Sequence, residues 1–187
     1  MPFKMVLQRE RGFSLLIIFV LLFVVVLLGS VGIYLINPLE KLREDRDRKR
    51  ISQLDELQKA VKLYLRNNPS EARLCDNCSL GQTVFAHQGV RIGASEALVI
   101  NSQSVGGPGW VPIDLSLNAG IGRTPLLTLP IDPLNKDPFV YTFTPGQDGK
   151  FKITASFESK ALLAKMATDG GTRVDRYEIG TDLSLVP

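Results

Sequence analysis

Histidine and cysteine are scarce in this sequence, whose 187 residues include one histidine, His87, and two cysteines, Cys75 and Cys78. A zinc site takes four ligands, so these side chains would need a carboxylate or a second subunit to complete one. A thiol enzyme needs a group that orients its histidine and an oxyanion hole, and no specific pattern for either surrounds His87. The sequence therefore predicts no catalytic centre, and His87 is interpreted as an exposed loop residue.

Clusters of basic residues are missing from residues 69–187, where ten cations stand against twelve anions. Nucleic-acid binding requires Lys and Arg gathered on one face to neutralise phosphates. The sequence therefore does not favour nucleic acid as a partner. Internal repeats and low-complexity tracts are also lacking.

Charge is absent from residues 13–36, which contain no Asp, Glu, Lys or Arg. As an α-helix this stretch would be about 36 Å long, which exceeds the ~30 Å hydrocarbon layer of a bilayer. A secretory signal peptide has a shorter apolar region, about 7–15 residues, ending at a small-x-small cleavage site. The stretch is therefore predicted to be one membrane span.

The charges that flank this span predict its orientation. Residues 1–12 hold three cations and one anion, a bias that favours a cytoplasmic N-terminus. Residues 40–50 hold six cations and four anions, but their signs mix in i,i+4 pairs such as Glu44 with Arg48, as on a hydrated helix face. The remainder of the chain is predicted to lie outside the cytoplasm.

Composition divides the chain into a leader (residues 1–12), the span (13–36), an amphipathic helix (37–68) and a head rich in glycine and proline (69–187). Pro38 removes one helical hydrogen bond and disfavours helix at Asn37, so a kink is predicted there. In the amphipathic helix, charged residues occupy one side. The other side carries an apolar stripe of Ile51, Leu54, Leu57, Val61, Tyr64 and Leu65.

The head shows short strand patterns separated by turns. Residues 97–100 and 110–117 are strand candidates, and residues 139–144 and 151–157 alternate as a hairpin with one buried aromatic face around "PGQDGK". A short helix over residues 159–166 and a strand over residues 177–179 follow. An α+β fold is predicted, in which a small antiparallel sheet packs its aromatic face on the apolar stripe.

The segment Arg11-Gly12-Phe13-Ser14-Leu15, at the start of the uncharged stretch, resembles the processing site of type IV prepilins and type II secretion pseudopilins. The resemblance extends to the proline-interrupted helix and the sheet, and "LPIDPLNKDPFVYTFTPGQDGKFKI" resembles the sheet region of major-pseudopilin heads. It implies a pilin-like fold. It also implies that a prepilin peptidase cuts between Gly12 and Phe13 and methylates the new N-terminus at Phe13.

The resemblance further implies a structural subunit rather than an enzyme. Such a subunit waits in the cytoplasmic membrane among lipids, with its head outside. It then joins other pilin or pseudopilin subunits in an extracytoplasmic filament, through an inner-membrane assembly platform. Adhesion and motility pili, secretion pseudopili and DNA-uptake filaments all fit this plan. The alternative is a membrane-tethered binding or sensing domain that keeps its leader and does not polymerise.

One position departs from the family pattern. Glutamate is usual at the fifth residue of the processed chain, where it is thought to pair with the N-terminal amine of a neighbouring subunit, and Ile17 stands there. An unpaired ammonium in apolar surroundings is costly, so docking in a filament should be weakened or altered. A minor or tip subunit is one hypothesis, and a filament with different packing is the other.

Two further constellations remain open from sequence. Cys75 and Cys78 form "CDNC", which an exported domain favours as a disulfide, with a zinc site, a redox pair and free thiols as alternatives. Major pseudopilins bind Ca²⁺ near the C-terminus, so calcium is the one metal weighed, with no cofactor otherwise predicted. The candidate ligands, equally explained by turns and caps, are Asp132, Asn135, Asp137, Asp169, Asp175 and Asp182.

Overall fold

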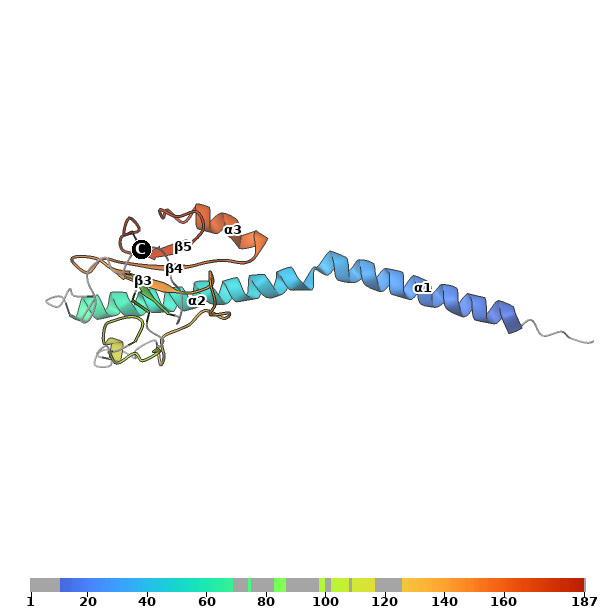
Figure 1. The fold of residues 1–187 in the computed structure, drawn as a ribbon, viewed down its shortest axis with the longest axis horizontal. Helices are drawn as coiled ribbons and strands as arrows, with labels where there is room; N and C mark the ends of the chain where they lie inside the picture. The colour runs from blue at the N-terminus through green and yellow to red at the C-terminus, as the bar shows by residue number, and fades with distance from the viewer. Residues whose placement is uncertain are drawn as a thin grey trace, which may run out of the picture. The chain divides into compact units, whose positions relative to one another are not determined.

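The computed structural model describes residues 11–68, 74, 83–86, 98–99, 102–107, 109–116 and 126–186. These residues include two long helices, α1 (Arg11–Ile36) and α2 (Pro38–Asn67), and then five short strands and the helix α3 (Lys160–Ala167) (Figure 1). The chain divides into two compact units, Met1–Lys41 and Leu42–Pro187. The first unit contains α1, and the second contains most of α2 together with the head.

The boundary between α1 and α2 lies at Asn37, beside the predicted kink at Pro38. Asn37 has a φ of 43°, in the left-handed region, so the helix cannot continue through it. Its carbonyl oxygen accepts hydrogen bonds from the backbone N–H groups of Glu40 (3.0 Å) and Lys41 (3.2 Å). Asn37 therefore ends one helix and caps the next, which is the local interruption that the proline predicts.

The apolar stripe of α2 packs into the head core, as predicted. Leu54, Leu57 and Val61 are fully buried, Tyr64 is 4% exposed, and Ile51 and Leu65 are partly buried against the same core. This helical spacing places one face of α2 against the sheet. The expectation that the charged residues all lie on the solvated side is wrong for two of them, since Asp47 and Arg50 are completely buried.

Five strands form one sheet in the order β2-β1-β3-β4-β5. Their bounds are Val84–Phe85 (β1), Leu98–Val99 (β2), Thr142–Pro145 (β3), Phe151–Ala155 (β4) and Tyr177–Gly180 (β5). The pairs β1–β3, β3–β4 and β4–β5 are antiparallel, whereas the pair β1–β2 is parallel. The predicted α+β class is confirmed, and the antiparallel description is wrong for this one edge pair.

The hairpin of β3 and β4 has two buried faces. Tyr141, Phe143, Phe151 and Ile153 alternate on the face that shares a core with α2, and the Tyr141 hydroxyl donates to Gln53 of α2 at 2.7 Å. In Figure 1 β3 and β4 run alongside α2. The opposite face holds polar side chains that are also buried, among them Thr142, Thr144, Lys152 and Thr154. The sequence pattern predicted only the aromatic face as buried.

Other elements of the head follow the sequence in part, since β1 was not predicted and one predicted strand does not form. The turn between β3 and β4 is closed by Gly146 N–H donating to the Lys150 carbonyl at 2.7 Å, with Gly149 at a φ of 72°. α3 and β5 lie within one residue of their predicted bounds. Residues 110–116 form no strand. Trp110 is buried, its indole N–H donates to the Pro130 carbonyl at 3.0 Å and its backbone N–H to the Ser102 carbonyl at 3.0 Å, while Asp114 forms an isolated bridge with Gly106.

Candidate functional site

The predicted processing site lies in the first turn of α1. The described helix begins at Arg11, so the Gly12–Phe13 bond is the second peptide bond inside it. Gly12 and Phe13 therefore belong to the first described residues of this helix.

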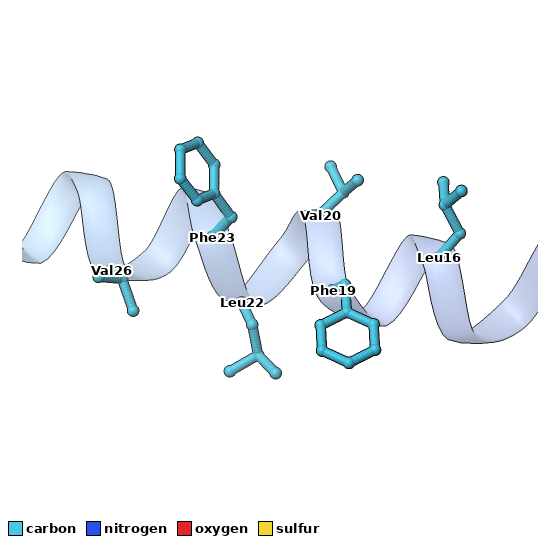
Figure 2. A pocket seen from close by; sticks show the side chains of 6 residues that line it. All are labelled: Leu16, Phe19, Val20, Leu22, Phe23 and Val26. Carbon is cyan, nitrogen blue, oxygen red and sulfur yellow. The ribbon is translucent and has the colours of Figure 1, made fainter.

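The surface of α1 that follows is uncharged and uncovered. Leu15–Gly32 is long and apolar enough to cross a membrane by length and composition, and none of it is buried within the chain. Leu16 is 61% exposed, Phe19 71% and Phe23 67%. Figure 2 shows apolar side chains that project to opposite sides of the helix, with Leu16, Val20 and Phe23 on one side and Phe19, Leu22 and Val26 on the other. Such a surface requires lipid or other apolar helices around it.

Ile17 belongs to this surface. Its side chain is 45% exposed and has only apolar neighbours along the helix from Leu15 to Leu28. The sequence of α1 from Arg11 to Ile36 contains no Asp or Glu, so the described helix carries no side-chain carboxylate. An ammonium group brought against this part of the helix would therefore meet no opposite charge from α1.

A cluster of buried charges joins α2 to the head. Arg50 forms a fork with Asp132, with Nε 2.7 Å from Oδ2 and Nη2 2.9 Å from Oδ1. Its Nη1 also donates to Asp47 at 2.7 Å and to Glu158 at 2.6 Å. Arg46 closes the cluster through a second fork on Glu158, at 2.8 and 2.7 Å. Two guanidinium groups therefore hold three carboxylates at the base of the sheet.

Burial and pairing oppose each other in this cluster. Burial by itself would lower the pKa of Arg50, but the hydrogen bonds and charge of Asp132, with those of Glu158 and Asp47, raise it above its usual value. Burial would likewise raise the pKa of Glu158, but the hydrogen bonds from Arg46 and Arg50 lower it. Arg50 and Glu158 therefore carry their charges at neutral pH, and the cluster depends on every partner being present.

Asp47 has a second role in this cluster. Its carboxylate accepts the backbone N–H groups of Glu158 (3.0 Å) and Ser159 (2.7 Å), at the start of α3. Ser159 occupies the N-cap position but makes no side-chain capping bond of its own. A carboxylate from α2 therefore takes the place of the local cap, and the negative charge suits the positive end of the α3 dipole.

Acid should weaken this cluster in a predictable direction. Glu158 has a folded-state pKa below its usual value, so its stabilisation is complete above about pH 4.5 and is lost as the pH falls through the folded pKa. The variant Glu158→Gln lacks this contribution. We expect the difference in free energy of unfolding between the parent and this variant to shrink on acidification. Chemical denaturation from about pH 7 to about pH 3 measures it, and a difference that stays constant would contradict the expectation.

Of the three calcium candidates near the sheet, Asp132 is used in other interactions. Asp132 pairs with Arg50 and accepts the backbone N–H of Leu134 at 2.8 Å. Asn135 adopts a φ of 45° with its side-chain oxygen buried, and Asp137 is exposed and precedes Pro138 in a cis peptide bond. These three residues share a loop, but its carboxylates do not converge on a common point, since Asp132 turns inward to α2.

The candidates at the C-terminal end are also occupied. Asp169 accepts the backbone N–H groups of Gly171 (2.8 Å) and Glu178 (2.7 Å). Asp175 pairs with Arg173 at 2.6 Å, and Asp182 lies 3.4 Å from Lys150. Among the residues that the structure describes, no group of three or more His, Cys, Asp and Glu side chains is placed to hold a metal ion. Cys75, Cys78 and His87 lie outside the described residues.

The buried charges were missed by the sequence interpretation. Arg50 lies one position before the apolar stripe, and its partners Asp132 and Glu158 are 82 and 108 residues away along the chain. A charge pattern read along one helix carries no signal for such partners. Comparison of the chain with models of known families, with curated proteins and with solved structures found no match.

Proposed function

We propose that this chain is a structural subunit of a type IV pilus or a type II secretion-like pseudopilus. Prepilin peptidase cuts it after Gly12, and the processed chain assembles through α1. The observation that carries the proposal is the uncovered apolar surface of Leu15–Gly32, directly after the Arg-Gly-Phe junction. The head, built on the continuation of the same chain into α2, supports the proposal because it provides a soluble domain outside the membrane.

The physical basis of assembly is the need to cover α1. In the cytoplasmic membrane, lipid tails surround this helix and leave it no apolar surface in contact with water. Once the subunit leaves the bilayer, neighbouring copies of α1 must replace the lipid. Burial of apolar area contributes about 25 cal/mol per Å² removed from water, so a bundle of such helices holds together without specific polar contacts.

The proposed partners of the chain are the proteins that process, extract and surround such a subunit. A prepilin peptidase processes the chain, an inner-membrane assembly platform extracts it, and other subunits of the filament surround it. No catalytic chemistry is assigned to the chain itself. Ile17 removes the usual carboxylate from the docking position, so the subunit either occupies a minor or terminal place in the filament or packs differently from its family.

Mass spectrometry of the protein from its native membrane tests the proposal. We expect a chain that begins at N-methylated Phe13, because the peptidase removes residues 1–12 and methylates the new amine. Finding Met1 at the start of all the chains would contradict processing and favour the tethered binding or sensing domain. The same sample should contain the processed chain within shed or sheared fibres, and its absence from every fibre would contradict assembly.

A further inference from the structure

Lys152 is the most deeply buried cation of the sheet. It lies in β4 on the polar face opposite α2, and its side chain is 0% exposed. Burying an ammonium group is costly unless opposite charge and hydrogen-bond acceptors surround it. Its neighbours are therefore informative about why the chain keeps a lysine at this position.

Three oxygen atoms surround the Lys152 ammonium, each from a different segment. Nζ lies 3.0 Å from Glu178 Oε1 of β5, 3.3 Å from the Leu183 carbonyl oxygen, and 3.5 Å from Thr172 Oγ1. Glu178 Oε1 makes no hydrogen bond within the described part of the chain, so the charge of Lys152 is what compensates its burial. Lys152 Nζ therefore donates hydrogen bonds to the Leu183 carbonyl and the Thr172 hydroxyl and forms an ion pair with Glu178 Oε1.

The second oxygen of Glu178 organises the loop before β5. Oε2 accepts the backbone N–H groups of Thr172 and Arg173, while the Asp169 carboxylate accepts those of Gly171 and Glu178. The loop therefore folds around two carboxylates, and one of them rests on Lys152. The C-terminal segment also contacts β4. The Leu183 carbonyl accepts a hydrogen bond from Lys152, and the Thr181 hydroxyl accepts one from the Phe151 N–H at 3.0 Å.

Calcium, which the family resemblance implies for this end of the chain, does not fit these residues. Ca²⁺ takes six to eight oxygen ligands at about 2.3–2.6 Å. Here Asp169 is directed at backbone N–H groups, Asp175 at Arg173, and Asp182 at Lys150 and the Ser184 N–H. The carboxylate oxygen left over, Glu178 Oε1, already faces an ammonium at 3.0 Å.

We propose that Lys152 serves as a built-in cation that joins the loop of residues 169–178 to the C-terminal segment, in the role that a bound metal ion would otherwise fill. The described C-terminal part of the head, residues 126–186, then completes its fold without a divalent cation. Its stability, and any assembly that depends on it, is independent of calcium in the surroundings. This inference concerns the head alone and does not depend on whether the chain forms filaments.

Thermal unfolding of the full-length chain in detergent tests this role, with EDTA or added Ca²⁺ in parallel samples. We expect the parent chain to give the same Tm in both. Lys152→Met keeps the length of the side chain but removes its charge, so its Tm should fall by roughly 10 °C because the Glu178 carboxylate is left buried without compensation. Adding Glu178→Gln removes that carboxylate charge, so the double variant should recover at least about half of the loss.

Lys150→Met provides the matched control, because Lys150 is two residues away, is 55% exposed and forms its ion pair with Asp182 at the surface. Its Tm should change by no more than about 2 °C. A parent Tm that falls in EDTA or rises with Ca²⁺ would overturn the proposal, as would equal losses in the two lysine variants. If Lys152→Met does not fold, recovery of folded protein by the double variant supports the proposal, and failure to recover it overturns the proposal.

Discussion

Replacing Gly12 with leucine is expected to leave the chain in the membrane as an unprocessed precursor. A peptidase must bring its catalytic groups close to the backbone between Gly12 and Phe13, and glycine offers no side chain to obstruct them. A leucine adds a branched side chain next to the bond to be cut. We expect essentially all of the protein to retain residues 1–12, as read by intact mass or by gel mobility of the membrane fraction.

The control is Gly29→Leu, which adds the same side chain to the same helix. A Cβ at Gly29 meets nothing within 4 Å, so the chain itself tolerates the substitution. In the proposed course processing precedes assembly, so this variant should be cut as efficiently as the parent. Normal maturation of the Gly12 variant would contradict the proposed processing site. Loss of processing in both variants would show that the effect is not specific to the junction.

Replacing Arg50 with methionine is expected to lower the free energy of unfolding of the head by about 3–5 kcal/mol. Arg50 is 0% exposed and contacts three carboxylates. Methionine fills much of the volume but leaves Asp132 and Asp47 buried without their cation. Because a domain is stable by only about 5–15 kcal/mol, such a loss is a large fraction of the total. Denaturant unfolding followed by near-ultraviolet circular dichroism measures it.

The matched substitution is Arg48→Met, two residues away on the same helix. Arg48 has a side chain that is 74% exposed and lies 3.9 Å from Glu44, an i,i+4 pair at the surface. Exposed pairs of this kind contribute about 0–1 kcal/mol, so this variant should unfold close to the parent. Equal losses in the two variants would show that the buried cluster does not hold α2 to the head.

Local patterns explain which parts of the fold could be predicted. The uncharged run of α1 specifies a helix that is apolar on all sides, and the three-and-four spacing of Leu54, Leu57 and Val61 in α2 specifies a helix and its buried face. The hairpin of β3 and β4 was equally predictable, since a period of two on each side of a glycine turn defines both strands. Position 37 was predictable because proline acts on its immediate neighbour.

Contacts between residues far apart in the sequence explain the parts of the fold that could not be predicted. A strand was predicted over residues 110–117, but residues 110–116 form a loop, because burial of Trp110 and its bond to Pro130 decide that segment rather than β propensity. On the polar face of the hairpin, Lys152 is compensated by Glu178, Thr172 and Leu183, which follow the hairpin in the chain. Of the candidate site, the junction at Gly12 and the apolar surface were visible in the sequence, whereas the interactions of Asp132, Asp169 and Asp182 were not.

The sequence alone determined that this chain has a helix apolar enough to span a membrane, a charged junction before it, and an amphipathic helix that must bury one face. These are properties of neighbouring residues, and hydrophobicity and backbone sterics act on them locally. Only the tertiary structure decided where the charges of Asp47, Arg50 and Lys152 lie. Their burial is tolerated because partners from remote segments compensate them, and such compensation exists only once the chain has folded.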